Sequence, residues 1–333
     1  MTATRAPEKP VAEARAADGP VLETRVQGFL DAVSTRRRLS QSELPATRRL
    51  IEAAQHVERA RAGVEVQEIE ITCGPSASVW ARILRPRGAI GALPAIVYLH
   101  GGGWVLGSVR THDRLLRDLV VETGAVVVAP TYSLSPEARY PTALEECFSV
   151  LNYLAGTPRG LWVDRSRIIV AGDGSGGNLA AALALLAKHR GGPRLAAQVL
   201  LCPWLDRTTV GSGSSAPEVD AFPRSEEVEW CWRQYATTPA QAREITLSPA
   251  RAQVAQLAGL PRTLIITTDV DVTRDAAEVY ARRLRAAGVS VLAVRYDGTI
   301  PDFLVINDLC GTTAARAALA QVTVFIQPPF RQA

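Results

Sequence analysis

Short runs of apolar residues alternate along the chain with longer segments in which apolar residues recur at helical spacing. Residues 95–99 are apolar throughout, as in a strand buried on both faces, and residues 113–123 have an amphipathic helical pattern. This order recurs, which predicts parallel strands joined by helices. The predicted strands of this series are residues 95–99, 125–129, 168–171, 197–202, 263–267 and 289–296, and the predicted helices are residues 113–123, 141–154, 177–189, 274–287 and 312–325.

Two more strands and two more helices are predicted ahead of this series. Residues 64–72 and 78–84 alternate apolar and polar side chains, and Gly74-Pro75 between them indicates a hairpin. Residues 21–34 and 43–61 have helical periodicity. The fold class is therefore α/β, with a mostly parallel sheet of eight strands flanked by helices.

The predicted order of elements is that of one domain over residues 21–333. Residues 205–260 break the alternation of strands and helices, and they include a predicted helix at 225–235. We expect this insertion and residues 21–61 to form a helical lid, although residues 21–61 also fit a plain pair of surface helices. Residues 1–20 are rich in Ala, Pro and charge and are expected to be disordered.

Composition and charge exclude several classes of function. The chain has 333 residues, 47% of them hydrophobic, and its formal charge of +4 is small, with no basic stripe for nucleic acid. No segment approaches the roughly 20 consecutive apolar residues of a membrane span. The five cysteines form no C-x-x-C pair and no metal-binding cluster. We therefore expect no nucleic acid, membrane, metal or cofactor, and a reducing, cytoplasmic compartment.

Two glycine-rich segments follow predicted strands. The first, HGGGW at residues 100–104, has three successive glycines whose amides can approach a ligand closely and hold an oxyanion. The second, GDGSG at residues 172–176, lies between a buried strand and an Ala- and Leu-rich helix. Strand, sharp turn and helix are typical of a nucleophile elbow, G-x-S-x-G, but the central residue here is Gly174 and a serine follows at Ser175.

Together these segments resemble the hormone-sensitive-lipase-like branch of the α/β-hydrolase superfamily. The resemblance covers about residues 20–325. It implies an α/β-hydrolase fold with a helical lid, an oxyanion hole made by the backbone amides of Gly102, Gly103 and Ser175, and a possible homodimer through residues 289–296. Further matching pieces are Thr111-His112-Asp113, Ser135-Pro136-Glu137, Tyr140-Pro141, Ser248-Pro249 and Leu260-Pro261.

The resemblance also shows which catalytic side chains are replaced. In that family an elbow serine works with an aspartate and a histidine. On the family pattern Gly174 occupies the serine position, Asp271 the acid position and Pro301 the histidine position, while Asp302 replaces a glycine. Two of the three triad side chains are therefore absent. A single Ser-to-Gly change would explain Gly174, but not Pro301 and Asp302 as well.

Ser175 is the obvious substitute nucleophile, but the pattern argues against it. One residue past the elbow, a side chain points in another direction and only the amide faces the site. His100 and His112 match family positions outside the triad, and His56 and His189 fall on predicted helices away from the sheet edge. A serine hydroxyl without a base is a weak nucleophile, so we do not expect hydrolysis through Ser175.

Other side chains are the better candidates for chemistry. Asp271 and Asp302 are candidate proton-transfer groups, because desolvated or paired carboxylates acquire raised pKa values. The simpler alternatives are a loop carboxylate bonded to backbone amides for Asp271 and a solvated surface charge for Asp302. Four aromatic residues are expected to line an apolar pocket, although each fits a core position equally well: Trp104, Tyr132, Trp204 and Phe303.

These features favour an enzyme that is not a hydrolase. We expect it to bind an apolar, carbonyl-containing small molecule and to promote cyclisation, isomerisation, elimination or addition, with the oxyanion hole polarising the carbonyl. Two alternatives remain open. One is a small-molecule receptor, as the resemblance implies for family members that have lost the triad histidine, and the other is a residual carboxylesterase or lipase.

Overall fold

The computed structural model describes residues 20–34, 40–57, 61–73, 75–156, 161–209 and 222–327. Residues 1–19 of the expected tail lie outside the described residues, as do Gly74 of the predicted hairpin turn and residues 210–221 of the expected lid insertion. Within the described part of the chain, none of the helices has the length and apolar character needed to cross a bilayer.

The centre of the molecule is one sheet of eight strands in the order β1-β2-β4-β3-β5-β6-β7-β8. β1 pairs with β2 and β2 with β4 in antiparallel fashion, and every other pairing is parallel. The predicted α/β class and eight-stranded, mostly parallel sheet are thereby confirmed. The strands are β1 (Val64–Cys73), β2 (Ala77–Pro86), β3 (Leu93–Leu99), β4 (Val126–Pro130), β5 (Val163–Asp173), β6 (Ala197–Leu201), β7 (Arg262–Thr268) and β8 (Val291–Tyr296).

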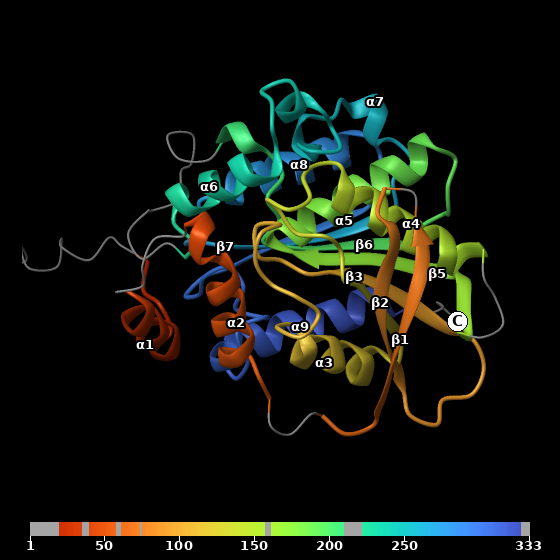
Figure 1. The fold of residues 1–333 in the computed structure, drawn as a ribbon, viewed down its shortest axis with the longest axis horizontal. Coiled ribbons are helices and arrows are strands. Elements are labelled where there is room, and N and C mark those ends of the chain that lie inside the picture. Colours follow the sequence, from red (N-terminus) through yellow and green to blue (C-terminus); the bar gives the residue numbers. More distant parts are fainter. Residues whose placement is uncertain are drawn as a thin grey trace, which may run out of the picture.

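Helices cover both faces of the sheet. In Figure 1, α3 and α9 lie below the sheet, and α4, α5 and α8 lie above it. These helices are α3 (Asp113–Thr123), α4 (Thr142–Gly156), α5 (Gly174–His189), α8 (Arg274–Ala286) and α9 (Thr313–Ile326). Because both faces are covered, the central strands are apolar on both sides, and all five residues of β4 and of β6 are buried.

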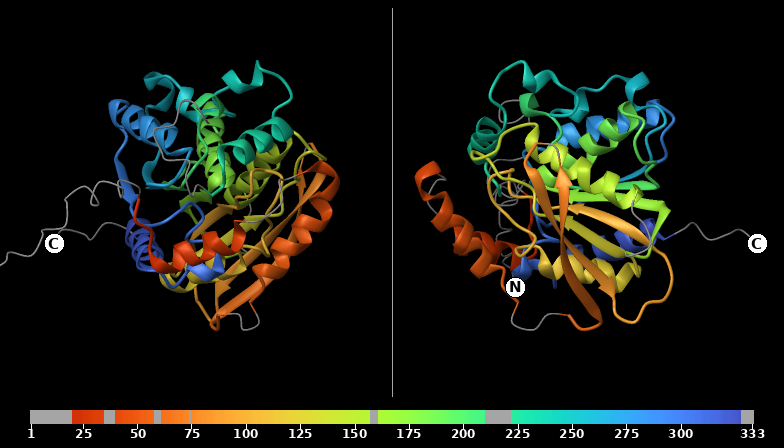
Figure 2. Two further views of the ribbon diagram at one scale, coloured as in Figure 1. Left: turned by 90° about the vertical axis from the view of Figure 1, so that its left-hand side faces the viewer. Right: turned by 45° about the vertical axis from the view of Figure 1, so that its right-hand side comes forward.

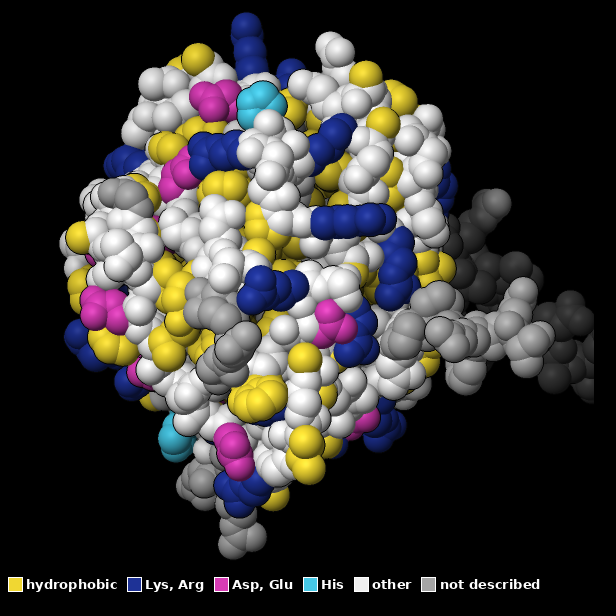
Figure 3. Space-filling view, turned by 90° about the vertical axis from the view of Figure 1, so that its right-hand side faces the viewer, with side chains coloured by type: hydrophobic (Ala, Val, Ile, Leu, Met, Phe, Trp, Pro, Cys, Tyr) yellow, Lys and Arg dark blue, Asp and Glu magenta, His cyan; other side chains and the backbone are white. Residues whose placement is uncertain are grey.

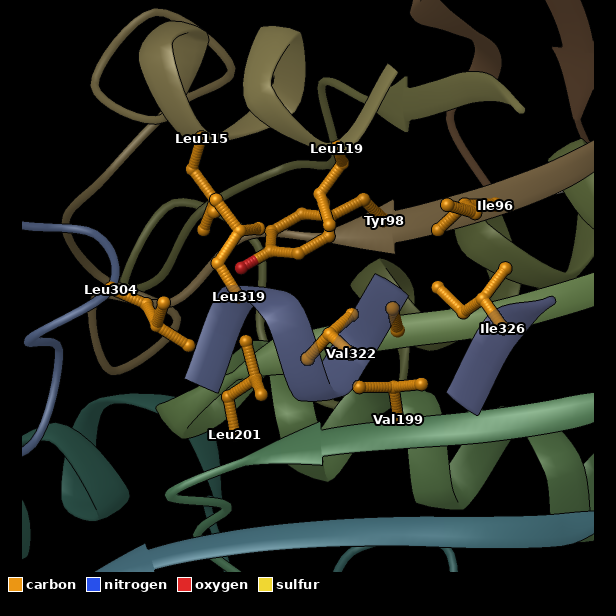
Figure 4. Close-up of a pocket in the computed structure, with 11 residues that line it drawn as sticks. Ile96, Tyr98, Leu115, Leu119, Val199, Leu201, Leu304, Leu319, Val322 and Ile326 are labelled. Atoms are coloured by element: carbon orange, nitrogen blue, oxygen red, sulfur yellow. The ribbon is translucent and has the colours of Figure 1, made fainter. Parts of the chain in front are cut away.

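The core between the sheet and its lower helices is tightly filled. Side chains of β3, β6, α3 and α9 meet there around a cavity of about 10 Å³, drawn in Figure 4. The labelled side chains are all apolar except for the hydroxyl of Tyr98, which donates a hydrogen bond of 2.7 Å to Asp173. This packing anchors the end of β5 from below.

Three further helices lie beyond the carboxyl ends of the parallel strands, the edge that faces the viewer in the left view of Figure 2. They are α1 (Thr24–Val33), α2 (Leu44–Ala54) and α6 (Ser225–Tyr235), and the short α7 (Val254–Leu257) contacts α8. The predicted helix 43–61 is shorter than expected. It ends at Ala54 because Gln55 bonds to Asn307 instead. The side-chain oxygen of Gln55 accepts from the backbone amide of Asn307, and the backbone carbonyl of Gln55 accepts from the Asn307 side chain.

Candidate functional site

The predicted elbow lies where β5 ends at Asp173 and α5 begins at Gly174, so the helix starts three residues earlier than the predicted residue 177. Gly174 has a φ of +50°, in the left-handed region. An added Cβ at Gly176 would lie 2.0 Å from the carbonyl oxygen of Leu99, so glycine is required there. At Gly174 the nearest atom, Nε1 of Trp204, would be 3.7 Å away. A side chain would therefore fit at the elbow position.

The HGGGW loop places two glycine amides beside the elbow. Gly102 and Gly103 have φ values of 109° and 66°, and a Cβ at Gly103 would lie 2.5 Å from Sγ of Cys231. Within the described part of the chain neither amide donates a hydrogen bond, although the amide of the next residue, Trp104, donates to Oγ of Ser175. The amides of these two glycines are thus free to bind an acceptor beside the first turn of α5.

Ser175 is used to hold these two segments together. Its hydroxyl is fully buried and accepts the hydrogen bond of 3.1 Å from the amide of Trp104. Among the described residues no histidine nitrogen is hydrogen-bonded to this hydroxyl. The amide of Ser175 lies in the first turn of α5, where backbone N–H groups lack a partner within the helix. The expected role of the Ser175 amide as a donor in the oxyanion hole is therefore compatible with the structure.

A buried ion pair supports the elbow from behind. Nε2 of His112 lies 3.3 Å from the Asp173 carboxylate, which also accepts bonds from Tyr98 and the amide of Gly101. Burial favours neutral groups, but the pair outweighs it, so the pKa of Asp173 is lowered and that of His112 is raised. His100 differs, because burial and the neighbouring His112 lower its pKa to about 3. Neither histidine serves as a base at the elbow.

Asp271 lies in the turn after β7 and is buried, with 2% of its surface exposed. Its Oδ1 accepts bonds of 2.7 Å from both the amide and the hydroxyl of Thr273, whereas Oδ2 is buried with no partner among the described residues. Burial raises the pKa of Asp271 to about 6. On the family pattern the histidine would stand at Pro301, which has no N–H to donate. The unpaired Oδ2 of Asp271 is therefore consistent with the loss of that histidine.

Asp302 is the carboxylate that lies at the elbow. Its Oδ1 would be 3.9 Å from a Cβ at Gly174, and its φ of +61° is rare for a residue with a side chain. The side chain is half-buried rather than a solvated surface charge. Burial raises the pKa of Asp302 to about 7, and the charges of Asp173 and Asp271 act in the same direction. A group that ionises near neutral pH therefore lies beside Gly174.

The four predicted pocket aromatics do not share one environment. Trp104, Tyr132 and Phe303 are at most 2% exposed, and Trp104 is stacked on Tyr235 with ring centroids 4.4 Å apart. In this structure they are core residues behind the site. Trp204 alone is brought next to Gly174, through Nε1 and through a hydrogen bond of 3.0 Å from its amide to the Gly174 carbonyl.

The structure adds a feature that the sequence did not indicate, a polar stripe on α2 consisting of Arg48, Glu52 and Gln55. Arg48 donates to the carbonyl of Val105, and Glu52 accepts from the hydroxyl of Ser108, both in the loop after HGGGW. Gln55 binds the segment that follows Asp302, where its Nε2 donates 2.9 Å to the Val305 carbonyl. The spacing i, i+4 and i+7 was the available signal, because it places three polar side chains on one helix face.

Another hollow lies far from these residues. A groove of about 660 Å³ opens at the amino ends of the parallel strands and is lined by Lys188, Arg194 and Arg262 among others. Figure 3 faces this edge and shows Lys and Arg side chains around apolar surface. No group of three or more potential metal ligands occurs among the residues that the structure describes. The elbow, with its free glycine amides and the half-buried carboxylate of Asp302, is the better candidate site.

The fold and the elbow together define an α/β hydrolase, and residues 96–305 match the family described as alpha/beta hydrolase fold. The chain belongs to this family, and the resemblance to its hormone-sensitive-lipase-like branch is confirmed. An α/β hydrolase of Acanthamoeba polyphaga mimivirus is 32% identical over 88% of this chain and 84% of its own length. An ethyl acetate hydrolase of Pseudomonas putida is 34% identical over 72% of this chain and 76% of its own length. A thermostable esterase from Pseudomonas putida has a TM-score of 0.86 at 37% identity, covering 94% of this chain and 100% of that one.

Proposed function

We propose that the protein is a non-hydrolytic enzyme of the cyclase, isomerase or lyase type that acts on an apolar, carbonyl-containing small molecule. The substrate oxygen accepts hydrogen bonds from the amides of Gly102, Gly103 and Ser175, and a proton moves through Asp302. The observation that carries the proposal is the elbow itself. Gly174 offers no nucleophile although a side chain would fit, and a half-buried carboxylate that ionises near neutral pH stands beside it.

The common step of such reactions is proton transfer next to a carbonyl. The Asp302 carboxylate takes a proton from the carbon adjacent to the carbonyl, and the C–H electron pair becomes the C=C bond of an enolate. The negative charge develops on the oxygen, where fixed amide donors stabilise it. Asp271 does not need to touch the substrate, because its buried charge raises the pKa of Asp302 and so makes Asp302 a stronger base.

The first test is exchange of the carbon-bound protons of cyclohexanone in heavy water, followed by proton NMR. We expect the protein to accelerate exchange and the rate to rise with pH through about 7, as Asp302 ionises. Asp302→Asn should reduce the rate by at least about 100-fold, the usual contribution of general base catalysis. Asp308→Asn, at an exposed site nearby, should leave it unchanged. Binding without exchange would instead favour a receptor.

The second candidate is a residual carboxylesterase, which the comparisons favour because similar proteins are named as ester hydrolases. In this case Asp302 would activate a water molecule, since Ser175 is buried and bonded to the glycine loop. Turnover of p-nitrophenyl acetate separates the candidates. The proposal predicts turnover no faster than that of Asp302→Asn, whereas an esterase would lose its activity in that variant.

The compartment remains part of the proposal. All five cysteines are free, and four of them are buried. Unpaired buried thiols fit a reducing compartment, so we place the reaction in the cytoplasm. Fractionation of the native host cells, with the protein detected by antibody, would test this placement.

A further inference from the structure

The carboxylate beside the elbow forms no ion pair with the residues that the structure describes. Among the described residues, no Lys or Arg forms an ion pair with Asp302, and its side chain takes part in no hydrogen bond. The nearest charges are those of Asp173, His112 and Asp271. Because His112 is paired with Asp173, these two cancel each other. The side of the site that holds Asp302 therefore has an excess of negative charge.

A second, independent feature points the same way. Oδ2 of Asp271 is buried and has no hydrogen-bond partner among the described residues, although its carboxylate is close enough to act on Asp302. The charge of Arg274 acts on Asp271, but the Arg274 side chain donates to the Asp269 carbonyl and lies 3.4 Å from Asp275. Buried carboxylates are either paired or protonated, so above about pH 7, where Asp271 and Asp302 are both ionised, a cation of the ligand would supply the missing partner.

The elbow also brings the Trp204 indole and the Asp302 carboxylate close to the backbone amides. Nε1 of Trp204 and Oδ1 of Asp302 would lie 3.7 Å and 3.9 Å from the same point, a Cβ at Gly174. The Asp302 carboxylate attracts an ammonium group, whereas the N–H of the Trp204 indole can donate a hydrogen bond to an oxygen of the same ligand. The amide of Ser175, the residue directly after Gly174, is one of the proposed donors to the substrate oxygen. A ligand that reaches both groups needs its oxygen and its cation only a few bonds apart.

We propose that the substrate is an amino-carbonyl compound, whose oxygen faces the amides of Gly102, Gly103 and Ser175 and whose ammonium group pairs with Asp302 beside Trp204. This inference rests on the proposed function and replaces its apolar substrate by one that carries an ammonium group near the carbonyl. One oxygen of the Asp302 carboxylate pairs with that group, and the other takes the proton. Asp271 is buried, and its charge also acts on Asp302, so it adds a second carboxylate to this side of the site.

The test compares ligands of the same shape by isothermal titration calorimetry with the full chain. Diacetonamine has an ammonium group where methyl neopentyl ketone has a methyl group, and diacetone alcohol has a hydroxyl group there. At about pH 8, where Asp302 is ionised, diacetonamine should bind at least about tenfold more tightly than either neutral ketone, as for a charged hydrogen bond. At about pH 6 the preference should shrink as Asp302 and then Asp271 become protonated.

Variants locate the effect. Asp302→Asn keeps the shape of the side chain and should reduce the preference for diacetonamine to about twofold or less. Asp308→Asn is the exposed control and should retain the full preference. Equal affinities of the three ligands, or a preference that survives Asp302→Asn, would overturn the inference. Neither result affects the proton exchange of cyclohexanone, which tests the proposed function separately.

Discussion

Restoring a side chain at the elbow is the change whose cost follows most directly from the structure. Gly174→Ser introduces a Cβ whose nearest neighbour is 3.7 Å away, an ordinary contact distance. The expected cost is therefore backbone strain alone, because the φ of +50° is disfavoured for a residue with a side chain. Left-handed backbone costs about 1 to 2 kcal/mol per residue, so Gly174→Ser should lower the free energy of unfolding by about that amount.

Two other glycines provide matched controls. Gly124, at the end of α3, has a φ of +69° and no atom within 4 Å of an added Cβ, so Gly124→Ser measures the same strain without contacts. Gly176→Ser instead places its Cβ 2.0 Å from a backbone oxygen of β3. Because backbone must move, we expect a loss above about 4 kcal/mol or failure to fold.

Urea denaturation followed by circular dichroism gives the three free energies of unfolding. Gly174→Ser and Gly124→Ser should agree to within about 1 kcal/mol, while Gly176→Ser is far less stable. If Gly174→Ser were as damaging as Gly176→Ser, glycine at the elbow would be a packing requirement. The inference that position 174 has room for a nucleophilic side chain but has lost it would then be wrong.

Three further variants test the site and the core. Gln55→Ala removes the hydrogen bond to the segment after Asp302 and should slow ketone proton exchange, whereas exposed Arg49→Ala should not, as NMR rates would show. The folded-state pKa of Asp271, about 6, exceeds the usual 3.8, so the contribution of this carboxyl to stability falls as pH rises between these values. In urea denaturation, the free energy of unfolding of Asp271→Asn should therefore rise by up to about 3 kcal/mol relative to wild type between about pH 4 and pH 7. Leu119→Ala enlarges the cavity of Figure 4 and should cost about 2 to 5 kcal/mol by the same measurement.

Much of the fold was predictable because its signals are local. Continuous apolar runs such as residues 95–99 identify strands buried on both faces, and helix α3 begins and ends where its amphipathic pattern does. Boundaries failed where tertiary contacts override local preference. The helix that ends at Ala54 gives way to bonds between Gln55 and Asn307, some 250 residues later, and no local pattern reports such a contact.

The site was predictable only in part. The motifs located Gly102, Gly103 and Gly174, because close backbone approach restricts those positions to a few residue types. They did not show that Asp302 is half-buried at the elbow, since a single aspartate in a loop has the same pattern whether it faces solvent or a pocket. They also could not separate a fully buried tryptophan such as Trp104 from one beside Gly174 such as Trp204, because the two look alike in a sequence.

We infer that an α/β-hydrolase scaffold has kept its amide donors while losing the side chains that cleave esters. The most direct test is hydrolysis of p-nitrophenyl acetate by wild type beside the double variant Gly174→Ser/Pro301→His. We predict no turnover by wild type above the Asp302→Asn variant and a measurable gain in the double variant, whose histidine would stand next to the unpaired oxygen of Asp271. Brisk hydrolysis by wild type, lost on Ser175→Ala, would contradict the claim.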